Sequence, residues 1–310
     1  MKGKKRVLVT GAGGFLGNAV VGALLRKPDT EVTAVCHRTE KCRPFFSHPR
    51  LSVRTADLVF EEEVASLLNA CQPDTVIHLA ALARLQQGEK QPEKAVTVNL
   101  RGTLYLLQQA SAQGVKRFLF TSSDLARYAK SVTGITKLLA ERYLQLFPGT
   151  LPQVITFRMP NLYGFPGSVT DIFARQIAEN KDLGITDERM ARRFITREEA
   201  VDYLFYLMEN GKNHQVYSVK QEPVFIKDLA LKMIAESGKD LKLRIIGARP
   251  GEKLYQASYS DDEAVDTGFR HLARLRLPPP SLGQVFACIR RLPVSDTLKA
   301  VLQNQFKNLF

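Results

Sequence analysis

Apolar runs of strand length alternate with amphipathic segments of helix length through the first half of the chain. Runs rich in β-branched and aromatic residues predict strands, and apolar residues that recur every three to four positions predict helices. The predicted strands cover residues 6–10, 31–36, 51–54, 75–79, 117–121 and 153–157. The predicted helices between them cover residues 15–25, 61–69, 93–112 and 132–147. This alternation predicts an α/β fold, with a Rossmann-like doubly wound parallel sheet and ligands at the carboxyl ends of its strands.

Glycines spaced three apart follow the first predicted strand, in the order Thr10-Gly11-x-x-Gly14-x-x-Gly17. Gly11 allows a sharp turn, Gly14 leaves no Cβ between the backbone and a diphosphate, and Gly17 lets the next helix pack close to the sheet. The amino end of that helix supplies positive potential. Glycines also build ordinary turns, but this context predicts a dinucleotide site.

The rhythm changes after residue 158, where a passage rich in proline and glycine precedes predicted helices at 169–180, 197–210 and 226–237. We therefore predict a dinucleotide-binding domain at 1–158 and a smaller, helix-rich substrate lobe at 159–280, interleaved with the first domain. Three prolines at 278–280 precede a helical tail at 281–310. Its apolar residues Leu298, Val301, Leu302 and Phe306 favour a packed helix over one lying on a membrane surface.

The chain of 310 residues carries 44 Lys and Arg against 31 Asp and Glu, a net charge of +13. Such a balance favours anionic partners, which include phosphorylated metabolites, nucleic acids and acidic membranes. We predict no nucleic-acid partner, because the positive residues are dispersed and no recognition module is present. No apolar run reaches the roughly 20 residues of a membrane span, and glycines interrupt any signal-peptide core.

The cysteines show neither Cys-x-x-Cys pairing nor the spacing of a disulfide framework, which predicts free thiols and a cytoplasmic protein. They are Cys36, Cys42, Cys71 and Cys288. The local group of Cys36, His37, Cys42 and His48 matches no common zinc module, so we predict no metal site.

The end of the second predicted strand lacks the acidic residue that binds the ribose 2′-hydroxyl in NAD-dependent folds. It reads Cys36-His37-Arg38, with Lys41 and Arg43 close behind. We therefore predict NADP rather than NAD, with Arg38 on the 2′-phosphate; a solvated basic loop is the alternative.

These motifs resemble the extended short-chain dehydrogenase/reductase superfamily over nearly the whole chain to about residue 270. Asp57 is similar to its adenine-contacting acid, His78-Leu79-Ala80-Ala81 to the loop after its fourth strand, and Asn99 to its structural asparagine. The cofactor-binding residues that the resemblance implies are Gly11, Gly14, Phe15, Leu16, Gly17, Arg38, Asp57, Leu58, Ala80, Asn99 and Lys137.

The second half resembles bacterial UDP-N-acetylglucosamine 4,6-dehydratases of polysaccharide biosynthesis, through Gly167-Ser168-Val169 and the stretches 193–201 and 249–254. The resemblance implies that Arg249 and Glu252 grip the nucleotide diphosphate and ribose, which suits a guanidinium fork and a carboxylate. Asn161 and Arg193 are lesser substrate candidates, each open to a capping or ion-pair role instead.

The catalytic pattern departs from the superfamily at two places. The usual Tyr-x-x-x-Lys becomes Thr133-Gly134-Ile135-Thr136-Lys137, so the lysine is kept and the tyrosine is replaced by a much weaker acid. The dehydratases' Ser-Thr-Asp-Lys becomes Ser122-Ser123-Asp124-Leu125, which keeps an acid and a hydroxyl but loses the base. Tyr128 in the same loop is a hypothetical replacement acid.

The resemblance implies an NADP-dependent enzyme of dehydratase or epimerase type that acts on a UDP-hexosamine through a 4-keto intermediate. Because Leu125 cannot move a proton, dehydration, epimerisation and keto-sugar reduction all stay open. A catalytically degenerate protein that binds NADP(H) and a nucleotide sugar, as a sensor or as the partner of an active enzyme, is the alternative. Relatives pair through the helix carrying Lys137, which implies a homo-oligomer.

Overall fold

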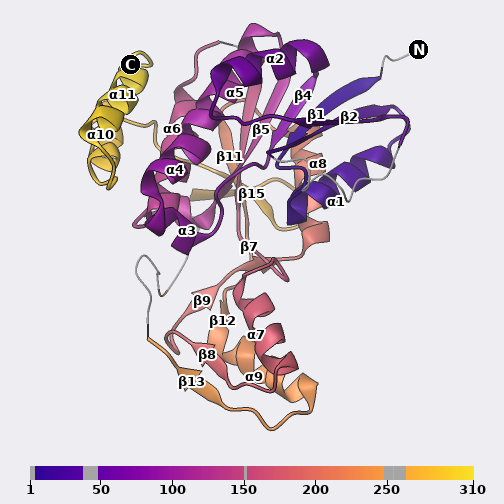
Figure 1. Ribbon diagram of the computed structural model, residues 1–310, viewed down its shortest axis with the longest axis vertical. Coiled ribbons are helices and arrows are strands. Elements are labelled where there is room, and N and C mark those ends of the chain that lie inside the picture. The colour runs from indigo at the N-terminus through magenta and orange to yellow at the C-terminus, as the bar shows by residue number, and fades with distance from the viewer. Residues whose placement is uncertain (1–3, 38–47, 150–151, 248–253, 255–262) are drawn as a thin grey trace.

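The computed structural model describes residues 4–37, 48–149, 152–247, 254 and 263–310. Within them, a nine-stranded sheet in the order β14-β15-β11-β6-β5-β4-β1-β2-β3 forms the larger part of the molecule (Figure 1). Its strands are β1 (Lys5–Thr10), β2 (Thr30–Cys36), β3 (Leu51–Thr55), β4 (Thr75–His78), β5 (Arg117–Ser123), β6 (Gln153–Met159), β11 (Gln215–Val219), β14 (Ala264–Asp266) and β15 (Leu272–Leu275). The seven neighbouring strands β11, β6, β5, β4, β1, β2 and β3 pair in parallel, whereas β15 is antiparallel to both its neighbours, β11 and β14. This mostly parallel, Rossmann-like sheet confirms the predicted fold class.

Helices cover both faces of the sheet (Figure 1). One face packs against α2 (Glu61–Cys71), α5 (Gly102–Ala112) and α6 (Val132–Leu146), and the other against α1 (Phe15–Leu25) and α8 (Arg197–Asn210). Local signals fix where two of these helices begin. Ser131 Oγ accepts a hydrogen bond from Gly134 N at 3.0 Å and so caps α6, and a capping box of Thr196 and Glu199 starts α8.

The helix predicted over 93–112 is continuous but not uniform. It consists of α4 (Pro92–Val96), a π-helical turn at Thr97–Arg101, and α5. The wider turn carries Asn99, which is fully buried. Single π-helical turns inside α-helices often mark functional positions.

A smaller lobe hangs below the large sheet (Figure 1). It contains α7 (Val169–Ala178), α9 (Ile226–Ser237) and the two-stranded pairs β8–β13 and β9–β12. These strands are β8 (Leu183–Ile185), β9 (Ala191–Arg192), β12 (Val224–Phe225) and β13 (Leu243–Ile245). The lobe has its own apolar cluster around Phe173, Leu183 and Ile226. A further pair, β7 (Asn161–Leu162) with β10 (Phe194–Ile195), lies where the two parts meet.

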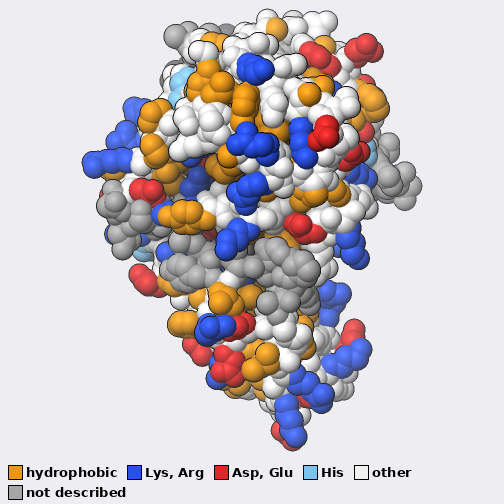
Figure 2. All heavy atoms as spheres, turned by 90° about the vertical axis from the view of Figure 1, so that its left-hand side faces the viewer, with side chains coloured by type: hydrophobic (Ala, Val, Ile, Leu, Met, Phe, Trp, Pro, Cys, Tyr) orange, Lys and Arg blue, Asp and Glu red, His pale blue; other side chains and the backbone are white. Residues whose placement is uncertain are grey.

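Two C-terminal helices, α10 (Leu282–Arg290) and α11 (Asp296–Lys307), lie beside α6 (Figure 1). The Phe306 ring is fully buried and meets Tyr143 of α6 edge to face, with ring centroids 5.6 Å apart. Leu302 is fully buried as well, so the prediction of a packed final helix is confirmed. Figure 2 shows this side of the molecule, where Lys and Arg side chains follow one another down the middle of the larger part.

The structure corrects the prediction of four free thiols. Cys36 is part of a disulfide, whereas Cys71 and Cys288 are free. Among the described helices, none has the length and apolar character needed to cross a bilayer.

Candidate active site

The predicted glycine turn follows β1 and is closely packed. Gly11 has φ +66°, and a Cβ added there would lie 2.7 Å from Ala80 N. Gly14 N donates to Gly11 O at 2.9 Å. A Cβ on Gly17 would collide with Gly11 O and lie 2.7 Å from Ala12 Cα. The backbone has therefore taken the space that side chains would occupy, which is the cradle a dinucleotide diphosphate requires.

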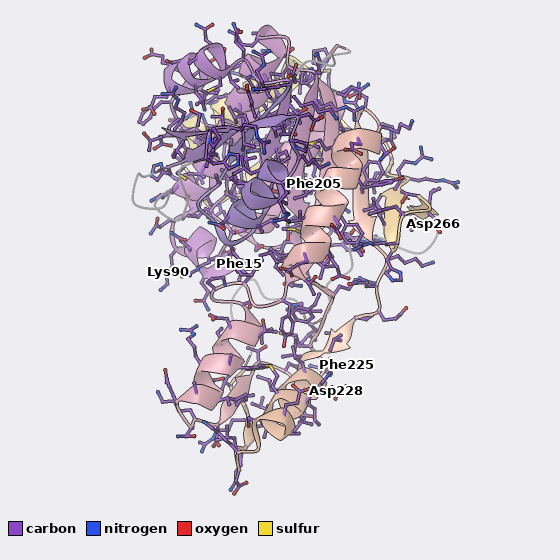
Figure 3. All side chains as sticks on the ribbon, turned by 90° about the vertical axis from the view of Figure 1, so that its right-hand side faces the viewer. Phe15, Lys90, Phe205, Phe225, Asp228 and Asp266 are labelled. Carbon is purple, nitrogen blue, oxygen red and sulfur yellow. The ribbon has the colours of Figure 1, made fainter. Side chains whose placement is uncertain are left out.

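The amino end of α1 completes this cradle. Gly14 is the residue before the helix, provides no side-chain cap, and no acidic residue lies in the first turn. The first amide N–H groups of a helix have no partner within the helix and carry positive potential, so they favour an anion. Phe15 lies at the boundary with the smaller lobe, edge to face with Phe165 (Figure 3). The described residues thus fit the diphosphate of a dinucleotide.

His78 at the end of β4 ties this turn to the neighbouring helix. Thr103 Oγ1 donates to Asn99 O at 2.8 Å, so its oxygen must accept from His78 Nε2, 2.9 Å away. His78 Nδ1 then accepts from Thr10 Oγ1 at 2.7 Å, while Thr10 Oγ1 accepts from Ala80 N at 3.2 Å. Burial, helped by the charge of Lys137, lowers the pKa of His78 to about 3. The imidazole is therefore neutral, with its proton on Nε2.

Asn99 braces the loop after β4 from the other side. Its Oδ1 accepts from Leu82 N at 2.7 Å, and its Nδ2 donates to Leu82 O and Thr136 Oγ1, both at 3.3 Å. The side chain therefore joins the π-helical turn, the loop carrying Ala80 and helix α6. This is a structural arrangement of the kind that the resemblance implied for Asn99.

Lys137 projects from α6 toward the end of β5. It is 6% exposed, and its Nζ donates to Thr121 O at 2.8 Å and lies 4.6 Å from the centre of the Phe120 ring. Burial lowers the pKa of Lys137 to about 8, although the Glu141 carboxylate partly opposes the shift. An amine whose pKa is lowered in this way can exchange a proton near neutral pH.

Thr133 lies one helical turn before Lys137, at the place where the superfamily has tyrosine. The side chain is buried, and its Oγ1 has no hydrogen-bond partner among the described residues. A Cβ on Gly88 of α3 (Leu85–Lys90) would collide with that hydroxyl. Glu89, the next residue of α3, accepts from Val132 N at 2.7 Å. Helix α3 is therefore fastened to the start of α6 and covers Thr133.

The loop after β5 contains the second altered motif. Ser123 Oγ accepts from Leu125 N at 3.3 Å and begins the 3₁₀ turn Asp124–Ala126. Asp124 is 2% exposed. Although burial opposes the charge of Arg158, the carboxylates of Glu141 and Asp124 raise the pKa of Arg158. Asp124 thus lies in a buried charged group that includes the 2.6 Å pair of Arg158 with Glu141.

The residues predicted to bind the adenosine part of the dinucleotide are only partly within the described residues. Asp57 Oδ2 lies 3.5 Å from His37 Nδ1, and its Oδ1 accepts from Val59 N at 3.2 Å. Leu58 packs under Gly102, where a Cβ would lie 3.2 Å from Leu58 O. Arg38, the predicted 2′-phosphate contact, lies outside the described residues.

Of the four residues predicted to bind substrate, two lie within the described residues and two do not. Asn161 Nδ2 donates to Arg193 O at 3.1 Å, and Arg193 Nε donates to Gln221 O at 2.6 Å. Both therefore help to build the junction between the two parts of the molecule. Arg249 and Glu252 lie outside the described residues.

Tyr128 does not lie with Lys137. It is 73% exposed, its hydroxyl accepts from Arg127 Nη2 at 3.0 Å, and it lines a pocket between α6 and α10. The structure gives no support for Tyr128 as a replacement acid.

Sequence reasoning missed three residues that shape this site. His78 appeared only as part of a motif, although a histidine ending a buried strand must find hydrogen-bond partners. Gly88 and Glu89 were not noticed, because the helix in which they lie is short. A glycine within a helical pattern, at the centre of α3, was the available signal for a close contact.

Comparison with known proteins places this site in a family. A family model described as "Polysaccharide biosynthesis protein" matches residues 7–275. The chain belongs to that family. It is 31% identical over 272 residues to the probable polysaccharide biosynthesis protein EpsC of Bacillus subtilis, covering 84% of this chain and 46% of that protein. The chain thus spans about half the length of EpsC. It is 28% identical over 270 residues to a UDP-glucose 4-epimerase of Rickettsia felis, covering 84% of this chain and 79% of the epimerase.

Solved structures agree with this assignment of the fold. Pen from Bacillus thuringiensis superposes with a TM-score of 0.82 at 27% identity, over 91% of this chain and 89% of Pen. DesIV, a dTDP-glucose 4,6-dehydratase of Streptomyces venezuelae solved with NAD and TYD bound, gives 0.73 at 20% identity, over 98% of this chain and 97% of DesIV. This family member therefore has the Rossmann-like fold that these solved structures share.

Proposed function

We propose that this protein is an NADP-dependent nucleotide-sugar enzyme of dehydratase or epimerase type, acting on a UDP-hexosamine through a 4-keto intermediate. The observation that carries the proposal is the closed backbone cradle at Gly11 and Gly17 after β1, with the Lys137 amine held by Thr121 O of β5, two strands away in the sheet. Relatives named as a UDP-glucose 4-epimerase and a polysaccharide biosynthesis protein support the nucleotide-sugar substrate.

Each step assigned to this chain follows from a described side chain. When bound, the nicotinamide would supply reversible hydride transfer at C4 of the sugar. Lys137 retains N–H donors beyond the one given to Thr121 O, and these suit ribose hydroxyls. A 4-keto group acidifies the C5 proton, and Asp124 is the candidate acid for a leaving 6-hydroxyl. Because Leu125 cannot act as a base, epimerisation and keto-sugar reduction are proposed as alternative reactions to dehydration.

The NADP preference rests on positive residues after β2 and on the missing acid at that strand's end. Dissociation constants for NADP and NAD, measured on the wild type and on Arg38→Ala, test it. We expect the wild type to favour NADP and Arg38→Ala to lose that preference. Equal or tighter NAD binding by the wild type would refute the assignment.

Activity is tested by incubating the protein with UDP-N-acetylglucosamine and NADP and analysing the sugar nucleotide by mass spectrometry. Dehydration removes the mass of one water, whereas epimerisation leaves the mass unchanged and alters the sugar's retention time and NMR spectrum. Lys137→Met is the matched inactive control. Absence of turnover with every nucleotide sugar tried, despite binding of cofactor and sugar, would exclude an enzyme.

One observation favours a second function, that of a catalytically degenerate binding protein. The hydroxyl at the tyrosine position, Thr133 Oγ1, is buried under Gly88 and therefore cannot meet a substrate in this arrangement. The double variant Thr133→Tyr with Leu125→Lys distinguishes the two functions. Turnover created from none would support degeneracy, whereas turnover already present in the wild type would exclude it.

A further inference from the structure

A pocket of about 410 Å³ lies between α6 and α10, lined in part by the loop after Asp124. Binding sites for small molecules commonly have volumes of a few hundred Å³. The glycine turn contributes no residue to the lining of this pocket, and neither does Lys137. The pocket is therefore separate from the proposed active site, and a ligand bound in it would be independent of the proposed function.

The charged side chains that line the pocket are all positive. Lys130 before α6, Arg142 on α6 and Arg291 after α10 line it, and no carboxylate of the described residues does. Arg142 Nη1 donates to Gln145 Oε1 at 3.0 Å, and Arg291 Nη2 donates to Ala129 O. Because a guanidinium carries five N–H donors, each arginine is anchored and still has donors to offer. Figure 2 shows Lys and Arg side chains in succession on this side of the molecule.

Apart from Gln284, the rest of the lining is apolar or aromatic. Leu138, Leu139 and Val285 contribute aliphatic surface. The exposed Tyr128 ring stands at the rim, with the Arg127 guanidinium 4.7 Å from its centre. The charge of Arg127 is balanced by Glu263, 2.6 Å away. An anion alone would leave this apolar surface unused, and an apolar molecule alone would leave three cations unpaired.

We propose that this pocket binds a small organic phosphate with an apolar or aromatic body. A phosphate presents several oxygens to cationic groups that converge from different elements, and guanidinium groups match it with paired hydrogen bonds. The body of the ligand would cover the aliphatic surface and stack on Tyr128.

Phenyl phosphate, titrated into the full chain and followed by calorimetry, tests this proposal. We expect saturable binding of one molecule per chain. Arg291→Leu and Lys130→Gln should each weaken it by roughly tenfold, which corresponds to about 1.4 kcal/mol. Arg290→Leu is the matched control, because Arg290 ends the same helix without lining the pocket and should leave the affinity unchanged.

A second readout places the ligand. Cys288 is a free thiol that lines the pocket, and Cys71 is a free thiol on α2 that does not. Phenyl phosphate should slow alkylation of Cys288 by N-ethylmaleimide and leave Cys71 unaffected. If Arg291→Leu fails to fold, as judged by circular dichroism, Lys130→Gln at the exposed rim carries the affinity test. No saturable binding, an equal loss in Arg290→Leu, or an unprotected Cys288 would overturn the proposal.

Discussion

The contact between Gly88 and Thr133 allows the packing of α3 on α6 to be tested quantitatively. A Cβ at Gly88 would collide with Thr133 Oγ1, with the Cβ and N atoms of Thr133 next at 3.6 Å. Overpacking of this kind costs about 1–3 kcal/mol, whereas replacing glycine by alanine inside a helix gains about 0.5–1 kcal/mol. We therefore expect Gly88→Ala to be destabilising in the wild type. In a Thr133→Ala background, where the hydroxyl is gone, we expect it to be stabilising.

The measurement is a double-mutant cycle of unfolding free energies from urea titration, followed by circular dichroism. The expected coupling is about 1–3 kcal/mol, since the two residues share one contact. Gly22→Ala is the control, because Gly22 lies in α1 and a Cβ there meets nothing within 4 Å. That variant should gain about 0.5–1 kcal/mol. Additivity of Gly88→Ala and Thr133→Ala within about 0.5 kcal/mol would refute the proposed packing of α3 on Thr133.

Three further predictions test the cradle, the buried amine and the C-terminal helices. Gly17→Ala should abolish dinucleotide binding in equilibrium dialysis and lower the unfolding midpoint, because its Cβ would collide with Gly11 O; unchanged binding would contradict the cradle. The folded pKa of Lys137, about 8, lies below its unfolded value of 10.5, so the unfolded chain binds more protons between these pH values and stability rises with pH there. The wild type should gain up to about 3 kcal/mol relative to Lys137→Met across this window in urea titrations, and a flat difference would show that the amine has an ordinary pKa. Phe306→Ala should cost about 3–5 kcal/mol in the same assay, because it leaves a cavity against Tyr143; a loss below about 1 kcal/mol would mean that α11 does not pack there.

Most of the large sheet could be predicted from the sequence because its signals are local. The helices predicted at 15–25, 197–210 and 226–237 are found with those bounds, and the six predicted strands are all present. Strands β11, β14 and β15, which extend the sheet, were missed. Two of these are very short, and their place depends on pairing with a distant edge rather than on their own pattern.

In the candidate site, too, features set by local sequence motifs could be predicted, whereas contacts between residues distant in sequence could not. Gly11 and Lys137 could be proposed as site residues because motif spacing alone singles them out. The structural asparagine could be proposed too, but the π-helical turn around it gave no periodic signal in the sequence. The Thr10–His78–Thr103 chain and the Gly88–Thr133 contact join residues far apart in sequence, so no local pattern could reveal them. The roles assigned to all the predicted site residues stay predictions, and Arg38, Arg249 and Glu252 lie outside the described residues.

The path of the chain between the two parts of the molecule determines how they can be made. The small lobe's apolar cluster draws on residues from Val169 to Leu243, yet within that span α8 covers the large sheet and β11 is one of its strands. On α8, Tyr203 and Leu204 are fully buried in the cluster that also holds α1. A fragment ending before the lobe would keep α1 but lack α8, which leaves part of that side of the sheet uncovered, and an excised lobe would carry α8 with nothing to pack on. The two parts therefore share buried contacts through α8 and β11, so we expect that exchanging either part alone with a relative would disturb the packing of both.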